Sequence, residues 1–126
     1  MEIKKINTNE APAAIGPYSQ AIVAGNFLYT SGQIPIDPEN SQMVDGDISV
    51  QTERVMKNLA AVLKAAGTDF ENAIKTTCFL ADMADFAAFN AVYEKYFVSR
   101  PARSCVAVRT LPKGALVEVE LVALIK

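Results

Sequence analysis

The stretch Leu116-Val117-Glu118-Val119-Glu120-Leu121-Val122-Ala123-Leu124-Ile125 carries the clearest structural signal in the chain. Side chains alternate between the two faces of a β-strand, so a strand here has an entirely apolar face and a second, mixed face. The apolar face holds Val117, Val119, Leu121, Ala123 and Ile125, and the mixed face holds Leu116, Glu118, Glu120, Val122 and Leu124. Because even the mixed face is rich in apolar residues, we predict a strand that is covered on both sides.

The whole chain, residues 1–126, is predicted to form a single layered domain around this strand. The prediction rests on residue alternation, helical spacing and turn residues. Alternation predicts further strands at 3–7, 19–24, 27–33, 74–81 and 103–110, with Gly25-Asn26 as a hairpin turn and residues 35–46 as an exposed loop. Helical spacing predicts one helix from the N-cap Asp47 to the stop signal Gly67, with Ser49 as an alternative N-cap. A second helix is capped by Asp82, with Asp85 in a capping-box position. The apolar stripe of this helix is assigned to the core and comprises Phe86, Phe89, Tyr93, Tyr96 and Phe97.

The order of these elements predicts an α/β (α+β) fold, a sheet of about six strands with two helices on one face. Two helices can cover only one face of such a sheet, so the second apolar face would be exposed in a monomer. Exposed apolar patches of this kind mark protein–protein interfaces. We therefore predict a homo-oligomer that is packed through the sheet.

Composition narrows the class of function. The 126 residues are 51% hydrophobic and carry a net charge of −2, which does not favour binding to nucleic-acid backbones. No histidine is present, which removes the commonest metal ligand and the usual general base. Cys78 and Cys105 are predicted to be free thiols. With no signal-peptide pattern and no apolar run long enough for a membrane span, we expect a soluble cytoplasmic domain.

Two pairs of residues stand out as candidates for chemistry. Arg103 and Cys105 are two residues apart on a predicted strand, so they share a face, and the guanidinium suits a bidentate carboxylate ligand. The competing interpretation is an intersubunit salt bridge from Arg103 to Glu118 or Glu120. These two carboxylates also share a face, and partial burial would bring either pKa into a useful acid–base range. The pattern alone does not favour one glutamate over the other.

Several ordered motifs resemble the RidA/YjgF family of enamine/imine deaminases, from about Asn7 to the C-terminus. They are the stretches 14–21 (Ala-Ile-Gly-Pro-Tyr-Ser-Gln-Ala), 30–35 (Thr-Ser-Gly-Gln-Ile-Pro), 75–77 (Lys-Thr-Thr), 100–106 (Arg-Pro-Ala-Arg-Ser-Cys-Val) and 111–120 (Leu-Pro-Lys-Gly-Ala-Leu-Val-Glu-Val-Glu). The resemblance implies a chorismate-mutase-like fold, a homotrimer with ligand sites between subunits, and no cofactor or metal. It also implies hydrolysis of 2-iminopropanoate and 2-iminobutanoate to 2-keto acids and ammonia. These imines derive from the enamine products of pyridoxal-phosphate-dependent dehydratases.

The resemblance further assigns roles to individual residues. Arg103 matches the residue that binds the substrate carboxylate, and Glu118, rather than Glu120, matches the carboxylate that activates water. The remaining matches are substrate-binding positions, namely Tyr18, Ser31, Gly32, Asn90 and Cys105. Two other functions are carried as alternatives. One is a regulatory protein that binds small carboxylates, and the other is a ribonuclease or translation inhibitor.

Overall fold

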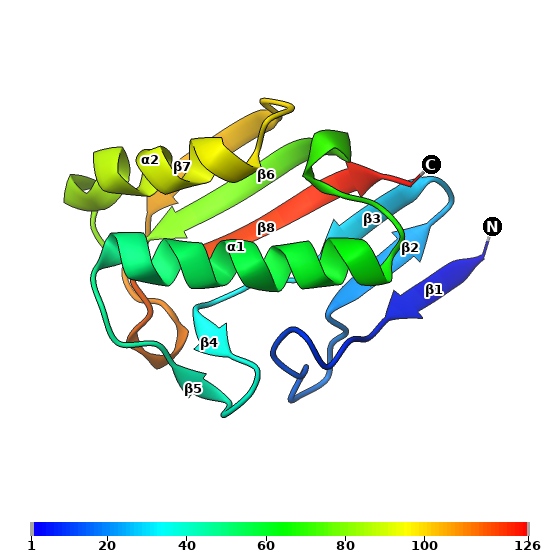
Figure 1. Ribbon diagram of the computed structural model, residues 1–126, viewed down its shortest axis with the longest axis horizontal. Coiled ribbons are helices and arrows are strands. Elements are labelled where there is room, and N and C mark those ends of the chain that lie inside the picture. Colours follow the sequence, from blue (N-terminus) through cyan, green and yellow to red (C-terminus); the bar gives the residue numbers. More distant parts are fainter. Residues whose placement is uncertain (1, 126) are drawn as a thin grey trace.

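The computed structural model describes residues 2–125 and contains one six-stranded sheet, a two-stranded sheet and two α-helices (Figure 1). The strands are β1 (Ile3–Ile6), β2 (Ala21–Ala24), β3 (Phe27–Thr30), β4 (Ile36–Asp37), β5 (Gln42–Met43), β6 (Ala73–Leu80), β7 (Ala102–Ala107) and β8 (Val117–Leu124). The helices are α1 (Ile48–Ala65) and α2 (Phe86–Tyr96). Both helices lie on the same face of the large sheet (Figure 1), as predicted.

The strand order of the large sheet is β1-β2-β3-β8-β6-β7. The last strand in the sequence, β8, is therefore in the interior and pairs antiparallel with both β3 and β6. β6 pairs in parallel with β7 at the edge of the sheet, and α2 forms the crossover between them. The predicted hairpin is confirmed, because β2 and β3 pair antiparallel around Gly25, whose φ of 60° is the left-handed conformation that such turns require.

Helix α1 follows the sequence prediction closely. The Asp47 side chain accepts a hydrogen bond from the Val50 amide and thus caps the first turn, which decides against Ser49 as the N-cap. At the other end Gly67 has a φ of 79°, and the Thr68 amide donates to the Leu63 carbonyl in a Schellman arrangement.

Helix α2 begins differently from the prediction. Asp82 caps a short 3₁₀ turn, Met83–Asp85, by accepting from the Ala84 amide at 2.9 Å. The α-helix then starts at Phe86, and Asp85 makes no side-chain capping bond. The capping-box interpretation of Asp82 and Asp85 is therefore wrong, because the 3₁₀ turn shifts the start of the α-helix by one turn.

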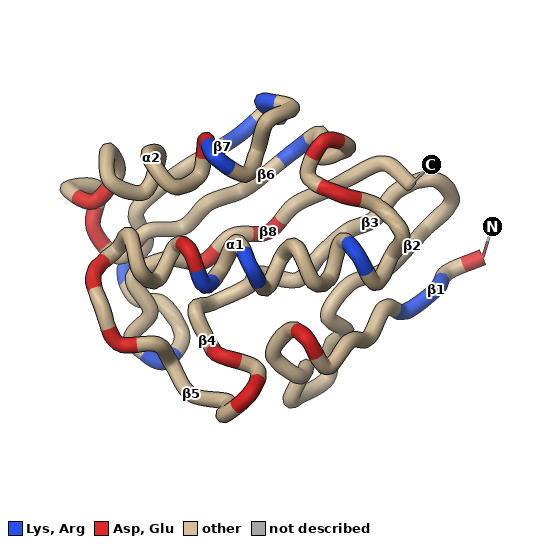
Figure 2. The backbone as a smooth tube through the Cα atoms, viewed as in Figure 1, with Lys and Arg blue, Asp and Glu red and all other residues tan. Residues whose placement is uncertain are grey.

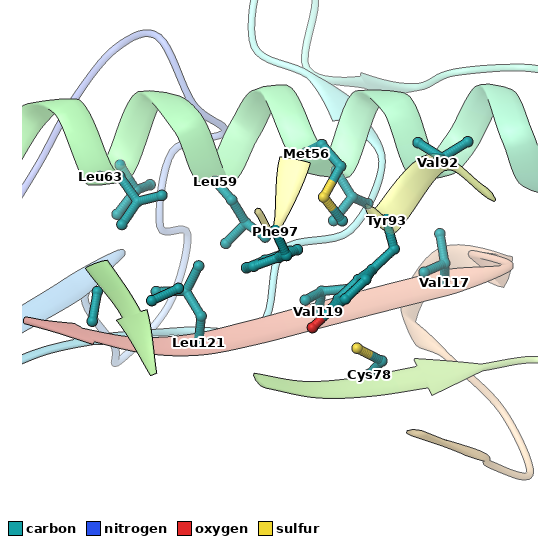
Figure 3. Packing of buried hydrophobic residues seen from close by; sticks show 14 of the residues in the cluster. Met56, Leu59, Leu63, Cys78, Val92, Tyr93, Phe97, Val117, Val119 and Leu121 are labelled. Atoms are coloured by element: carbon teal, nitrogen blue, oxygen red, sulfur yellow. The ribbon is translucent and has the colours of Figure 1, made fainter. Parts of the chain in front are cut away.

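The core lies between the two helices and the apolar face of β8 (Figure 3). Val117, Val119 and Leu121 of β8 are buried against α1 and α2, as the alternation predicts. The aromatic stripe of α2 is only partly core. Phe89 and Phe97 are fully enclosed, whereas Phe86 and Tyr96 are half-buried. No helix in the described part of the chain is long and apolar enough to cross a membrane.

The opposite face of the sheet carries no helix (Figure 1). Large apolar side chains on this face are substantially exposed in the single chain, with Tyr29 at 48% and Val106 at 46%. Register places them there, since Tyr29 pairs with Val122, and Val106 and Glu118 both pair with Phe79. An exposed apolar face is therefore present, as the residue pattern predicts.

The segment 35–46 is more ordered than a loop. β4 and β5 pair antiparallel in a two-residue ladder, with Ile36 opposite Met43. The turn is tightened by side chains, because Asp37 Oδ1 accepts from the Glu39 amide and Asn40 Oδ1 from the Gln42 amide. Strands of two residues are too short for alternation to reveal.

Candidate functional site

Arg103 lies on β7 at the edge of the sheet and points toward the helices. It pairs across the strands with the buried Thr76, so both side chains share the helix-covered face. Asn90 of α2 accepts a hydrogen bond from Nη1 of Arg103 at 2.7 Å. The guanidinium carbon lies 4.8 Å from the ring centroid of Tyr93 and 5.4 Å from that of Phe86. Both distances are within cation–π range.

The sequence assigned Phe86 and Tyr93 to the core and gave them no part in the site. Their spacing holds a signal that was missed, because Phe86, Asn90 and Tyr93 recur at i, i+4 and i+7 on one face of α2. An amide between two aromatic residues at that spacing is an unusual pattern for a core stripe. In the folded chain this face of α2 contacts the Arg103 guanidinium.

Cys105 shares the face of Arg103, as predicted, and pairs in register with Cys78 on β6. Both thiols are free. Burial raises the pKa of Cys78 to about 12 and also raises that of Cys105, which Arg103 partly offsets. Neither thiol therefore has the lowered pKa of a reactive nucleophile.

Glu118 lies on the opposite face of the sheet from Arg103. Its neighbour in β8, Val119, points into the core, and Glu118 and Glu120 both point away from it, half-buried. Burial, reinforced by the nearby charge of Glu120, raises the pKa of Glu118. The structure thus distinguishes the two glutamates, because only Glu118 packs against a wall of the pocket described below.

That wall is an irregularity at the end of β3. Tyr29 pairs with Val122, but the next pairing is Gln33 with Val119, so the segment 30–33 holds one residue more than the opposing part of β8. The Thr30 hydroxyl fills the gap in the ladder by accepting from the Leu121 amide at 3.0 Å. The extra residue brings Gly32 against the carboxylate of Glu118. A Cβ at Gly32 would overlap Glu118 Oε2 and lie 2.7 Å from Cδ, so only glycine fits without displacement of Glu118.

Ser31 lines the same wall, and its hydroxyl already has a partner. It donates to the Ser19 carbonyl at 2.6 Å, which leaves its oxygen as an acceptor toward the pocket. Tyr18 stands nearby on the loop that precedes β2, and more than half of its side chain is exposed. Both residues therefore line the same pocket as Glu118.

Buried amide side chains fix the loops around Glu118. Gln20 accepts from the Thr8 amide at 2.7 Å and donates to the carbonyls of Thr8, Ala11 and Pro12. Asn58 of α1 donates to the carbonyls of Ile34 and Ile36, and Gln51 accepts from the Leu116 amide. The loops are thus fixed by hydrogen bonds from buried amide side chains, a role that single-sequence patterns do not reveal.

The predicted site residues fall into two separate pockets. The Glu118 pocket has a volume of about 560 Å³ and is lined by Pro12, Ala13, Ile15, Tyr18, Gln20, Ser31, Gly32, Gln33, Ile34, Ile36, Pro112, Lys113 and Glu118. The Arg103 pocket has a volume of about 640 Å³ and is lined by Asn90, Tyr93, Glu94, Phe97, Val98, Arg100, Pro101 and Arg103. The two share no residue. Tyr18, Ser31 and Gly32 are brought together with Glu118, and Asn90 with Arg103, whereas Cys105 lines neither pocket.

Arg103 forms no ion pair within residues 2–125, although Glu94 lines the same pocket. Acidic residues are spread over several regions, including β4 and β5, the start of α1 and both ends of α2 (Figure 2). In residues 2–125 the only ion pair is Lys95 with Glu53, so the structure gives Arg103 no carboxylate partner there. The same residues contain no group of three His, Cys, Asp or Glu side chains that could hold a metal ion.

Comparisons with known proteins agree with this architecture. The family described as Endoribonuclease L-PSP matches residues 8–125. A Lactococcus lactis protein named as a candidate regulator, AldR, is 52% identical over 98% of this chain and 99% of its own length. The mouse 2-iminobutanoate/2-iminopropanoate deaminase is 49% identical over 95% of this chain and 90% of its own length. The solved structure of E. coli TdcF with bound serine has a TM-score of 0.92 at 39% identity, covering 98% of this chain and 99% of TdcF.

The six-stranded sheet with two helices on one face and a pocket on either side defines the class as a small α+β domain of the RidA type. The chain belongs to the RidA/YjgF family. The resemblance seen in the sequence motifs is thereby confirmed, together with the fold that it implies.

Proposed function

We propose that this chain is a cofactor-free 2-iminobutanoate/2-iminopropanoate deaminase. It converts the 2-imino acid to a 2-keto acid and ammonia. The name of the mouse relative supports this activity, and the serine bound to E. coli TdcF supports a small amino-acid-like ligand. The site is assembled from the Arg103 pocket of one copy and the Glu118 pocket of another, and a homotrimer holds three such sites.

The observation that carries the proposal is the state of Arg103. Its guanidinium is fixed by Asn90 at 2.7 Å and by two aromatic rings, yet no carboxylate of residues 2–125 neutralises it. A fixed guanidinium with free N–H groups is a receptor for an external carboxylate. Every 2-imino acid carries such a carboxylate next to the reacting carbon.

The second half of the site requires another copy of the chain. Arg103 and Glu118 point to opposite faces of one sheet, so a ligand bound to Arg103 cannot reach Glu118 of the same chain. The apolar, helix-free face around Glu118 is the surface that a neighbouring copy would cover. Closed symmetry then gives each copy one Arg103 pocket and one Glu118 pocket to share with its neighbours.

The chemistry needs only positioned water and one proton carrier. Arg103 holds the carboxylate of the substrate, whose imine nitrogen is protonated. The water oxygen attacks the imine carbon while Glu118 accepts a proton from the water, which gives a carbinolamine. Glu118 returns this proton to the amine nitrogen. The C–N bond then breaks, ammonia leaves, and the hydroxyl proton passes to Glu118 and on to ammonia. The 2-keto acid and an ammonium ion are the balanced products.

The environment of Glu118 suits this proton transfer. Its raised pKa lies nearer neutral pH than that of an exposed glutamate, so accepting and returning a proton are closer in free energy. The absence of a side chain at Gly32 leaves space for the carboxylate, and the pocket beside it has room for a water and a small side chain.

The test generates 2-aminoacrylate from serine with a dehydratase and follows pyruvate formation. We expect the wild-type chain to accelerate pyruvate release, and Arg103→Ala and Glu118→Gln each to reduce this by about 100-fold or more. Arg109→Ala, an exposed arginine outside both pockets, is the matched control and should keep full activity. A wild-type chain that leaves the spontaneous rate unchanged would contradict the proposal.

A regulatory protein that binds small carboxylates is the second candidate, favoured by the name of the L. lactis relative. It uses the same Arg103 receptor without turnover. Calorimetry with 2-ketobutyrate separates the two candidates. Binding that depends on Arg103, combined with no acceleration of pyruvate release, would select the regulator.

A further inference from the structure

The residues around Arg103 form a cradle that the proposed chemistry does not yet explain. We propose that Phe86, Tyr93 and Thr76 are positioning residues, which hold the Arg103 guanidinium in the orientation that binds a carboxylate. This inference rests on the proposed function, because the carboxylate is that of the substrate or product. It assigns a specific task to three residues of α2 and β6 that lie beneath the receptor.

The first part of the cradle is the face of α2. Phe86 and Tyr93 are two helical turns apart, with Asn90 between them, and the guanidinium carbon lies 5.4 Å and 4.8 Å from the two ring centroids. The rings restrict the guanidinium to this face by cation–π attraction, and Asn90 Oδ1 fixes its rotation through Nη1. Arginine has five N–H donors, so one bond to Asn90 leaves four for a ligand.

The second part lies underneath the Tyr93 ring. The Thr76 and Tyr93 hydroxyls share a hydrogen bond of 2.7 Å, and Thr76 is completely buried. Thr76 is also the register partner of Arg103 on the neighbouring strand. The bond therefore ties the ring on α2 to the strand next to the one that carries the guanidinium, and fixes the distance between them. This bond suggests a role for Thr76 within the Lys75-Thr76-Thr77 motif, to which the sequence assigned none.

A cradle of this kind should affect carboxylate binding more than the chemical step. A long arginine side chain loses rotamer entropy when it binds a ligand, and a side chain that is already held loses less. Loss of the cradle should therefore weaken carboxylate binding and raise KM, while kcat stays nearly constant because the attacking water is on the Glu118 side. A residue that only stabilised the fold would lower the melting temperature and leave both constants unchanged.

The experiment measures 2-ketobutyrate affinity by calorimetry, and KM and kcat for the imine, in the intact assembly. We expect Tyr93→Leu and Phe86→Leu to weaken binding by about tenfold each, as estimated from cation–π interactions. Tyr93→Phe and Thr76→Val should each weaken it by about threefold, and the double variant should be no worse than Thr76→Val alone, because both changes remove one shared hydrogen bond. If Tyr93→Leu does not fold, the Phe86→Leu and Tyr93→Phe variants carry the same test.

Tyr96→Phe is the matched control. Tyr96 is on the same helix, and its hydroxyl donates to Glu53 at 2.6 Å, away from Arg103, so its removal should leave affinity and KM unchanged. Affinities of Tyr93→Leu and Phe86→Leu within twofold of wild type would overturn the proposal, as would a wild type that binds no 2-ketobutyrate. A wild type that binds 2-ketobutyrate but hydrolyses no imine, with the cradle variants still weakened, would remove the proposed deaminase function and support the cradle.

Discussion

The Arg103 and Glu118 pockets are built in different ways. In the Arg103 pocket the guanidinium is held by regular elements, with side chains from α2 and β7 packed directly against one another, and the connection between them completes the lining. The walls of the Glu118 pocket are loops, and they hold their shape through a strand irregularity and a few buried amides such as Gln20 and Asn58. The difference indicates that the orientation of Arg103 depends on packing between regular elements, whereas the placement of Glu118 depends on individual hydrogen bonds and on one glycine.

Apart from substitutions of Arg103 or Glu118 themselves, Gly32→Ala should have the largest effect, and it acts on the Glu118 pocket alone. The new Cβ would displace the carboxylate, so we expect imine hydrolysis to fall by about 100-fold, or about 2.7 kcal/mol of transition-state stabilisation. Calorimetry should show 2-ketobutyrate binding at Arg103 reduced far less.

The control for this substitution is Gly67→Ala. Unlike Gly32, Gly67 has a positive φ, at 79°, and a Cβ there meets nothing within 4 Å. This variant should lose about 1 kcal/mol of stability and keep its activity. Equal activity of Gly32→Ala and wild type would mean that the added Cβ does not displace the Glu118 carboxylate from its active position.

Gln20→Ala should loosen the loop wall of the same pocket. The change removes four hydrogen bonds and leaves buried backbone groups near Thr8 and Pro12 without partners, so the free energy of unfolding should fall by about 2 kcal/mol. Urea denaturation measures this, with the exposed Gln42→Ala as control. A loss below about 0.5 kcal/mol would show that water replaces the amide readily.

The strands and helices that residue alternation and helical spacing define could be predicted from the sequence. β8, α1 and the β2–β3 hairpin follow from local patterns, and the roles of Arg103 and Glu118 are predictions from the family motifs. The face of β7 could not be predicted, because Arg103, Cys105 and Ala107 alternate with Ala102, Ser104 and Val106, and neither set is distinctly apolar. That face decides whether Arg103 and Glu118 can meet within one chain. The extra residue at 30–33 and the amide hydrogen bonds that fix the loops depend on contacts between distant parts of the chain, so no local pattern predicts them.

Tyr96→Phe tests the helix pair outside both pockets. The hydrogen bond to Glu53, with burial, raises the pKa of Tyr96 to about 12 from its usual 10.0. Its stabilising effect is therefore full below pH 10 and is lost as the pH rises toward 12. At pH 7 the variant should be less stable by about 1 kcal/mol, and thermal melts from pH 7 to 11.5 should show the difference shrinking. A difference independent of pH would contradict this assignment.

Glu118→Gln should have the smallest effect on stability. Unlike the substitutions above, it should stabilise the folded chain slightly at pH 7. Burial beside Glu120 raises the pKa of Glu118, so ionisation is penalised in the folded state, and stability is lost as the pH rises from below 4.5 through the raised value. The variant should be slightly more stable than wild type at pH 7, by less than about 1 kcal/mol, and equal to it below pH 4. Melting temperatures at the two pH values decide the sign, and a less stable variant at pH 7 would contradict it.

The most direct test of the central claim, that the Arg103 and Glu118 pockets of different copies form one site, is complementation between inactive variants. Arg103→Ala and Glu118→Gln chains are unfolded together, refolded at equal concentration, and assayed for imine hydrolysis beside each variant refolded alone. A site that takes its arginine from one copy and its glutamate from another is intact in about a quarter of random pairings, so the mixture should recover about 25% of wild-type activity. A mixture that forms hybrid oligomers, yet is no more active than the average of the two variants, would contradict the shared site.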